Sequence, residues 1–205
     1  MFFVQSCAVC NAETECGVFC PVCRRSELLL EAMPGLLNLD SAVMGYKYSG
    51  ALKKMLHKLK FEGESKFLQP LAEEAVFLAQ AYGESCFDMV ISVPTDTARR
   101  KQRGFDIPES IFAGALAVKG VWQPQVLARI KATAPQYGLA PDKRRSNVRG
   151  CFAVQGDVRG AKILLVDDIL TTGATLDEAA KTLKQAGAKS VYALTLCGSL
   201  ENFKD

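Results

Sequence analysis

The segment between Ile163 and Thr175 holds the densest group of side chains that could do chemistry. An apolar run leads into two adjacent acids, Asp167 and Asp168, and then into a turn rich in threonine. The apolar run is typical of a buried strand, and ligands of open parallel sheets bind at the carboxyl ends of strands. Backbone amides of the turn and of a following helix can surround a phosphate, and the lack of Gly-Lys-Ser/Thr excludes a P-loop.

This spacing predicts a ribose 5-phosphate site. The two acids would face the ribose hydroxyls, while the turn would hold the phosphate with backbone amides and hydroxyls. The alternative is a plain turn whose acids cap the helix, but capping needs one acid rather than two. The residues of the expected phosphate turn are Thr171, Thr172, Gly173, Ala174 and Thr175.

Cysteines form a second group with a chemical pattern. Five of the eight lie in the first 23 residues, and four of these make two Cys-x-x-Cys pairs, Cys7 with Cys10 and Cys20 with Cys23. Four thiolates in a tetrahedron select zinc, and metal binding would supply the folding energy of so short a segment. We expect these four residues to hold one structural Zn²⁺. Cys16 could replace a ligand or be a loop residue, and unligated thiols are the alternative.

Composition places the chain among ordinary globular proteins. Of the 205 residues, 49% are apolar and 23% are charged, and the net charge is only +3, which excludes a mainly disordered chain. No apolar run approaches the roughly 18 residues of a membrane span. The N-terminus has neither a basic region nor a long apolar region, so we expect no signal peptide and a cytoplasmic protein.

The elements that must position these residues alternate between strand and helix, which predicts an α/β domain with a parallel sheet. We expect a zinc-binding knuckle over 1–35 and the α/β domain over 36–205. Helices are expected at 26–33, 51–61, 66–82, 108–119 and 174–186, and strands at 87–93, 126–130, 162–166 and 190–196. Residues 36–50 are expected to be extended or turn-like, and residues 95–107 and 131–150 to lack regular structure.

The acidic and threonine-rich segment resembles the phosphoribosyl pyrophosphate (PRPP) motif of type I phosphoribosyltransferases. The chain as a whole resembles the ComF family of competence-associated proteins, some of which are described as amidophosphoribosyltransferase-like. The resemblance covers nearly all of the chain. It is carried by the four-cysteine knuckle, Leu59-Lys60-Phe61, Val93-Pro94, Arg103-Gly104-Phe105, Lys131-Ala132-Thr133-Ala134-Pro135-Gln136 and Arg145-Ser146-Asn147-Val148.

This resemblance implies a type I phosphoribosyltransferase-like parallel sheet flanked by helices. It implies that Asp167 and Asp168 hold the ribose hydroxyls of PRPP, partly through Mg²⁺, and that residues 171–175 bind its 5-phosphate. The loop after Val93 would lie at the pyrophosphate. Residues 131–150 would form a flexible loop that excludes water, and its candidate residues are Lys131, Thr133, Gln136, Arg145 and Asn147.

The chemistry of PRPP also needs positive charge, because breaking the anomeric bond leaves negative charge on pyrophosphate. Lys101 and Arg103 are the leading candidates beside Mg²⁺, within a wider basic set of Arg99, Arg100, Arg144 and Arg145. Two acids depart from the expected pattern. Asp106-Ile107 stands where the family commonly has Asn-Gln, and Asp96 lies in the pyrophosphate loop, where we expect it to bind a metal or face outward.

Lysines gather between residues 47 and 66, where six of them accompany His57. Such a stretch could grip a nucleic-acid backbone, with Tyr46, Tyr48 and Phe61 stacking on single-stranded bases. The alternative is a solvated lysine face opposite a leucine stripe. The candidate DNA-binding residues are Lys53, Lys54, Lys58 and Lys60.

Three functional hypotheses remain open on the sequence. The ComF resemblance implies a PRPP-binding protein that handles single-stranded DNA during natural transformation, with a competence helicase as partner. The chain could also be an active phosphoribosyltransferase acting on an unidentified acceptor. The third hypothesis is a non-catalytic interaction module for DNA or protein with a vestigial phosphate site, which the intact acidic pair and threonine turn argue against.

Overall fold

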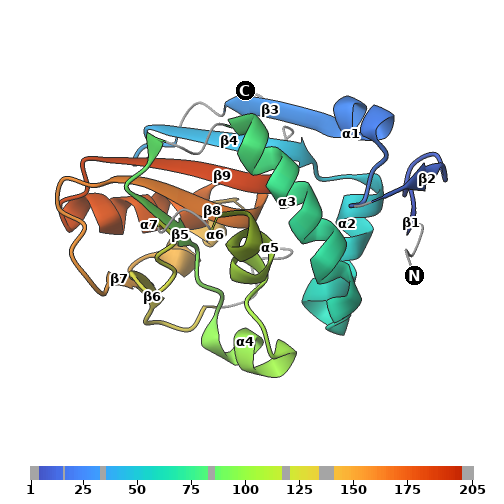
Figure 1. Ribbon diagram of the computed structural model, residues 1–205. Helices are drawn as coiled ribbons and strands as arrows, with labels where there is room; N and C mark the ends of the chain where they lie inside the picture. Colours follow the sequence, from blue (N-terminus) through green and yellow to red (C-terminus); the bar gives the residue numbers. More distant parts are fainter. Residues whose placement is uncertain are drawn as a thin grey trace.

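A five-stranded, mostly parallel sheet forms the centre of the protein (Figure 1). The computed structural model describes residues 5–15, 17–32, 36–82, 86–116, 121–133 and 141–199. The strand order is β3 (Leu28–Ala32), β4 (Ser41–Lys47), β9 (Ser190–Gly198), β8 (Lys162–Leu170) and β5 (Met89–Ser92). Only the pairing of β3 with β4 is antiparallel among these. The expected parallel α/β sheet is therefore confirmed.

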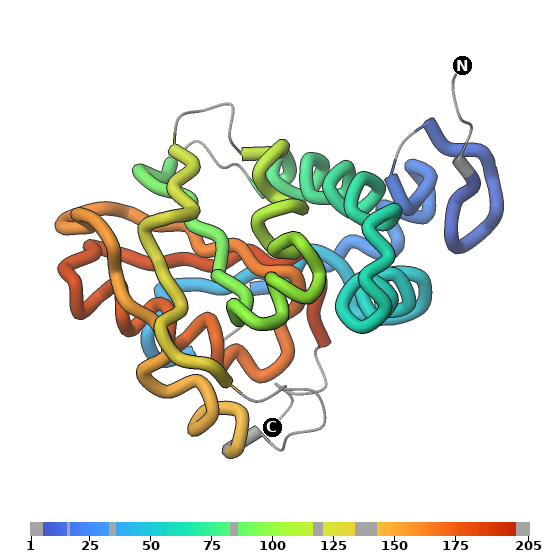
Figure 2. Tube along the Cα trace, turned by 90° about the horizontal axis from the view of Figure 1, so that it is seen from below, coloured from blue at the N-terminus to red at the C-terminus, as the bar shows by residue number. Residues whose placement is uncertain are grey.

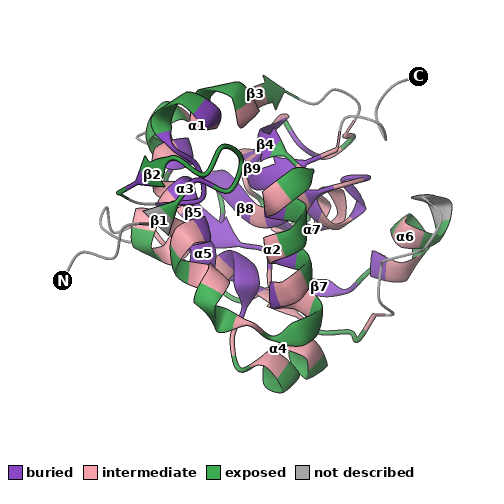
Figure 3. Cartoon of the chain, turned by 90° about the vertical axis from the view of Figure 1, so that its right-hand side faces the viewer, coloured by how far each residue is buried: buried purple, intermediate pink, exposed green. Residues whose placement is uncertain are grey.

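Helices cover both faces of the sheet (Figures 1 and 2). One face is covered by α2 (Gly50–His57), α3 (Leu68–Tyr82) and α5 (Ile107–Leu116), and the other by α6 (Pro141–Val148) and α7 (Ala174–Gln185). Side chains of β8 pack alternately into the two layers. Leu164 and Val166 belong to one apolar cluster, and Ile163 and Leu165 belong to the other. Figure 3 shows the sheet buried between these layers, with exposed residues on the outer faces of the helices.

A small N-terminal unit lies at one end of the molecule beside α2 and α3 (Figure 2). It consists of β1 (Gln5–Ser6), β2 (Glu13–Thr14) and α1 (Pro21–Glu27). Strand β3 follows α1 directly and pairs with β4 in the main sheet. Part of the segment 1–35, which we expected to be a separate knuckle, thus contributes an edge strand to the α/β domain.

The expected helix over 26–33 is wrong. The helix begins earlier, with Pro21 in its first turn, and it ends where Leu28 adopts an extended backbone. Leu28 and Leu30 pack against one apolar cluster and Leu29 against the other, which is strand alternation rather than a helical stripe. The remaining expected helices and strands are confirmed, with ends that shift by up to four residues; residues 117–119 of the helix expected over 108–119 lie outside the described residues.

Two short helices occupy segments that we expected to be irregular. Helix α4 (Thr97–Arg103) is capped by Asp96, whose side chain accepts a hydrogen bond from the Ala98 amide, and it ends at Gly104 with φ +84°. Helix α6 lies inside the expected loop over 131–150. Both helices are strongly polar and have no apolar stripe, which is why hydrophobic periodicity misses them.

The strand expected at 126–130 is β6 (Leu127–Arg129), but the sequence did not predict its antiparallel partner β7 (Phe152–Val154). Strand β8 is longer than expected and runs through the acidic pair to Leu170, because Asp167 and Leu170 still pair with β9. In the part of the chain that the structure describes, no helix is long and apolar enough to cross a membrane.

Candidate functional site

A hollow lies where β8 passes through a short turn into α7. Asp167 and the residues from Ile169 to Leu176 line it. Gly173 adopts φ +71°, and a Cβ at this position would overlap the side chain of Leu36. The turn therefore requires glycine both for its backbone conformation and for the close approach of the segment that precedes β4.

The hollow contains a polar atom that lacks a partner. The Thr172 side chain is buried, and its hydroxyl oxygen has no hydrogen-bond partner within the described residues. Buried polar atoms are almost always satisfied, so an unpaired hydroxyl beside a helix start is available to donate to a ligand. A phosphate suits these donors, since its oxygens accept from hydroxyls and from backbone amides at a helix N-terminus.

The two acids of the sequence motif have different environments. Asp167 lines the hollow, whereas Asp168 is buried and paired with Lys60, whose Nζ lies 2.8 Å from Asp168 Oδ2. The Asp168 amide donates to Asp167 Oδ1 at 2.8 Å, which ties the two residues together. The acidic pair and the threonine turn thus lie together in the structure. Lys60 also belongs to this group, whereas we expected it on an exposed lysine face.

Burial and charge shift the pKa values of this group in ways that follow from its contacts. Burial, and next the charge of Asp168, raise the pKa of Asp167 well above its usual range. Burial alone would lower the pKa of Lys60, but the two aspartates outweigh it and raise that pKa. Burial also raises the pKa of Cys197, whose thiol donates to the Asp168 carbonyl at 3.5 Å and so stays protonated.

The loop after β5 is built around Asp96. This buried side chain neither faces outward nor needs a metal, because its oxygens accept from the amides of Ala98 and Thr133. Although burial opposes the effect, hydrogen bonds from backbone amides lower the pKa of Asp96. Our expectation for Asp96 is therefore corrected: it caps α4 and anchors the start of the segment expected to be the flexible loop.

Two arginines also form hydrogen bonds with Thr133. Arg99 Nη2 donates to the Thr133 carbonyl at 3.0 Å, and Arg129 Nη2 donates to the Thr133 hydroxyl at 2.6 Å. Arg129 comes from β6, and its Nε is buried without a partner among the described residues. Burial, with Arg129 and Arg103 nearby, lowers the pKa of Arg99 against the opposing effect of Asp96. The loop after β5 therefore has a concentrated positive charge.

Other predicted residues are more dispersed. Lys101 is exposed on α4 and Arg103 is half-buried at its end, while Lys131 and Arg145 are exposed. Asn147 is half-buried on α6, and Gln136 and Cys16 lie outside the described residues. Asp106 is buried, accepts from the amides of Thr95 and Glu109, and so caps α5.

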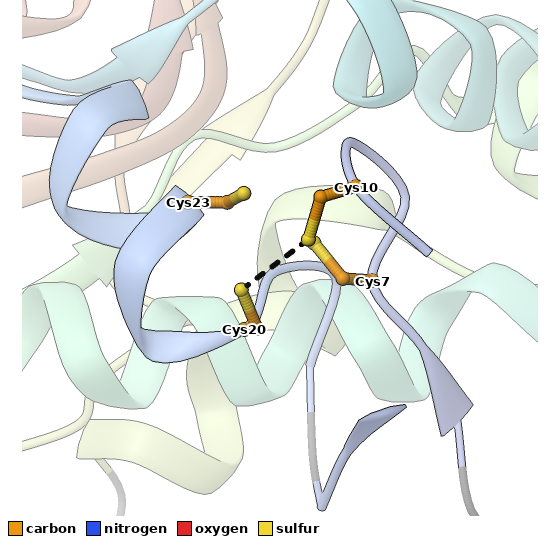
Figure 4. Close-up of side chains that lie close together, drawn as sticks. All are labelled: Cys7, Cys10, Cys20 and Cys23. Atoms are coloured by element: carbon orange, nitrogen blue, oxygen red, sulfur yellow. Dashed lines mark hydrogen bonds between the residues drawn. The ribbon is translucent and has the colours of Figure 1, made fainter. Parts of the chain in front are cut away.

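The four cysteines of the two Cys-x-x-Cys pairs converge at the N-terminal unit (Figure 4). Their sulfur atoms all lie within 4.8 Å of one another, and the sulfurs of Cys10 and Cys20 are 3.7 Å apart. Ligands at about 2.3 Å from a tetrahedral zinc ion would have sulfurs about 3.8 Å apart. The donor set and the spacing of Cys7, Cys10, Cys20 and Cys23 therefore fit one Zn²⁺.

A buried glutamate joins this cysteine cluster to the α/β domain. Glu74 on α3 has no exposed surface, and it accepts hydrogen bonds from the amides of Val18 and Phe19. Arg24 Nε and the Tyr46 hydroxyl each donate to it at 2.8 Å. The carboxylate is thus fully used in fixing the chain between the two cysteine pairs, and a Cβ at Gly17 would overlap it.

The chain is similar in sequence to several known proteins. The phosphoribosyl transferase domain profile matches residues 122–204. The DNA utilization protein YhgH of Salmonella typhimurium is 31% identical over 158 residues, which cover 75% of this chain and 70% of that protein. The chain belongs to the ComF family. The competence protein ComFC of Streptococcus pneumoniae is 28% identical to this ComF protein over 186 residues, covering 86% of this chain and 79% of that one.

The fold of the ComF protein is evident from its own sheet order and helix layers. Among solved structures, the glutamine PRPP amidotransferase of B. subtilis aligns with 69% of this chain and 30% of that one, at 18% identity and a TM-score of 0.42. The expected type I phosphoribosyltransferase-like architecture is confirmed, with its mostly parallel sheet, its flanking helices and an N-terminal four-cysteine cluster.

Loss of one cysteine tests the metal ligands of the ComF protein. Cys20→Ser is expected to lower the metal content from one ion per chain to nearly none, because a serine hydroxyl is a poor substitute for a thiolate. The N-terminal unit would then lose the energy that orders it and become sensitive to protease. Metal analysis and limited proteolysis measure both effects, with Cys151→Ser as a buried control outside the cluster. Retention of one ion per chain would show that the ligand set is different.

Proposed function

We propose that this ComF protein binds PRPP together with Mg²⁺ in the hollow between β8 and α7, and that it handles single-stranded DNA. The observation that carries the first part is the buried Thr172 hydroxyl, which has no partner among the described residues and shares the hollow with Asp167. The 5-phosphate would occupy the turn, and Asp167 would accept hydrogen bonds from the ribose hydroxyls. Mg²⁺ would supply positive charge that stabilises the pyrophosphate group.

The loop after β5 suits the other end of PRPP. Arg99, Arg103 and Arg129 supply positive charge there, and the buried Nε of Arg129 has no partner in the part of the chain that the structure describes. Pyrophosphate carries its charge on oxygens that arginine recognises well. Departure of pyrophosphate would develop charge next to these groups, which is the arrangement a phosphoribosyl transfer needs.

Calorimetric titration of PRPP with and without Mg²⁺ tests this function, with pyrophosphate release followed in the same samples. Mg²⁺-dependent binding supports the proposal. Release of pyrophosphate would add turnover and begin a search for the acceptor, whereas binding without release would support a PRPP-responsive binding protein. The absence of binding would overturn the PRPP site and leave an interaction module.

The DNA-handling part rests on the exposed face of α2 and on the roles named for the relatives. Lys53 and Lys54 are exposed, and Lys53 lies 5.9 Å from the ring of Tyr48. Lys58 is instead paired with Glu64 at 3.0 Å, and Lys60 is engaged at Asp168. We therefore assign the DNA contact to Lys53 and Lys54, and a competence helicase remains an expected partner.

Removing both exposed lysines should weaken single-stranded DNA binding. Lys53→Ala with Lys54→Ala is expected to lower the affinity about tenfold and to reduce the salt slope by about one to two, because fewer counterions are released. Fluorescence anisotropy over a salt series measures this. The matched control, Lys181→Ala with Lys189→Ala, removes the same charge from α7 and from the residue before β9. Equal salt slopes for the two pairs would make α2 a solvated helix face.

A further inference from the structure

Lys60 lies within the acidic site, although the other lysines of its helix face solvent. Its Nζ is 2.9 Å from Oδ1 and 2.8 Å from Oδ2 of Asp168, so one ammonium group spans both oxygens of the carboxylate. The Asp168 side chain is only 8% exposed and that of Lys60 is 28% exposed. Salt screens a sheltered pair much less than a surface pair.

Lys60 lies in a short segment where the α-helix changes to a π-helix. Helix α2 continues as a single π-helical turn, η1 (Lys58–Glu62), which ends at Gly63 with φ +69°. Leu59 is fully buried and fixes the turn against the sheet, next to Lys60. Single π-helical turns are rare and occur frequently at functional sites. This turn therefore carries the cation that pairs with Asp168.

We propose that Lys60 is the resident cation of the acidic pair and suppresses the binding of divalent metal until PRPP is present. While Lys60 spans both oxygens of Asp168, its positive charge offsets one of the two carboxylate charges. The three side chains together then present no more than one net negative charge to a metal ion. Mg²⁺ requires near-octahedral oxygen ligands and is held mainly by carboxylates together with substrate phosphates. With Asp168 engaged, the protein offers Mg²⁺ little more than Asp167, and PRPP must supply the remaining ligands. This inference rests on the proposed PRPP site and describes its regulation.

The test is a Mg²⁺ titration in the absence of PRPP. Lys60→Met keeps the length of the side chain but removes its charge, which exposes two adjacent carboxylates to the metal. The variant is expected to bind Mg²⁺ at least about tenfold more tightly than the unchanged protein, because a nearby positive charge has gone. Calorimetry gives the affinity, and a Mg²⁺-dependent rise of the melting temperature gives an independent readout. Lys60→Arg, which retains the charge, should behave like the unchanged protein.

Lys58→Met is the matched control. Lys58 belongs to the same turn and also forms an ion pair, with Glu64 at 3.0 Å, but its side chain is 44% exposed and does not contact the acidic pair. It should leave the Mg²⁺ affinity unchanged. Adding Asp168→Asn to Lys60→Met should abolish the gain, because the second carboxylate is then lost.

An unchanged Mg²⁺ affinity in folded Lys60→Met would overturn the proposal, as would an equal gain in Lys58→Met. If Lys60→Met does not fold, Lys60→Gln removes the charge while keeping a donor for Asp168, and the same titration decides. Because this titration contains no PRPP, its failure is separate from failure of the proposed function, which is judged by PRPP binding to the unchanged protein.

Discussion

Asp167→Asn is expected to weaken PRPP binding by about 10- to 100-fold and to leave the protein folded. The reason is that Asp167 is the acid that faces the hollow, and hydrogen bonds to a charged group contribute about 1.5–3 kcal/mol. Asparagine keeps the oxygen that accepts from the Asp168 amide. Burial disfavours the charge of Asp167, so its removal should not lower the free energy of unfolding. Calorimetry with PRPP and Mg²⁺, together with thermal melting, measures both quantities.

Two further variants make this result specific. Asp157→Asn removes an exposed acid that pairs with Arg159, and it should leave PRPP affinity unchanged. Thr172→Val removes only the hydroxyl and should weaken binding about tenfold with no loss of stability, because that hydroxyl makes no hydrogen bond to any described residue. Unchanged affinity in folded Asp167→Asn would place the ribose hydroxyls elsewhere.

Local patterns predicted most of the apolar strands and helices and also the two chemical motifs, but they gave a helix at 26–33 where the chain forms α1 and β3. Cysteine spacing predicted a cluster that the structure forms, since each Cys-x-x-Cys pair directs two thiols to one point. The acidic pair and the threonine turn lie together because they are continuous in sequence. Helices α4 and α6 could not be predicted this way, because neither has an apolar stripe.

The spacing of Lys60 and Glu74 from neighbouring leucines indicates that each lies on the apolar face of its helix. Lys60 continues the spacing of Leu52 and Leu56, so it lies on the apolar face of its helix rather than among the exposed lysines. Glu74 likewise lies between Leu71 and Leu78 on the buried face of α3. A charge on an apolar face must find a partner, and the partner cannot be read locally, since Asp168 is 108 residues from Lys60.

The contacts of Asp96, in contrast, have no signal in the sequence. Asp96 caps α4 by accepting a hydrogen bond from the Ala98 amide. It also accepts one from the amide of Thr133, which is 37 residues away in the sequence. No spacing in the sequence indicates that contact, so an acid in a loop expected to bind pyrophosphate looked like a repulsive element. In the structure its charge is satisfied by backbone donors, and the neighbouring arginines still provide positive charge for an anion.

Glu74→Gln is expected to lower the free energy of unfolding by about 3–5 kcal/mol, because it removes the carboxylate of a mostly buried ion pair with Arg24. The amide group of glutamine would also present donors to the donors of Val18, Phe19 and Tyr46. Chemical denaturation measures this change. Glu109→Gln is the matched control, since its pair with Arg100 is longer, at 3.5 Å, and more exposed, and the change should cost less than about 1 kcal/mol.

The same variant separates metal binding from docking. Glu74 is not a ligand, so Glu74→Gln should keep one metal ion per chain while residues 5–27 become accessible to protease, whereas Cys20→Ser should lose both metal and protection. If Glu74→Gln also loses the metal, the cysteine cluster forms only when it is docked on α3, and the two units would be one folding unit. If it retains both metal and protection, the apolar contacts of Phe19 and Tyr46, whose ring centroids are 5.6 Å apart, would be sufficient to hold the N-terminal unit in place.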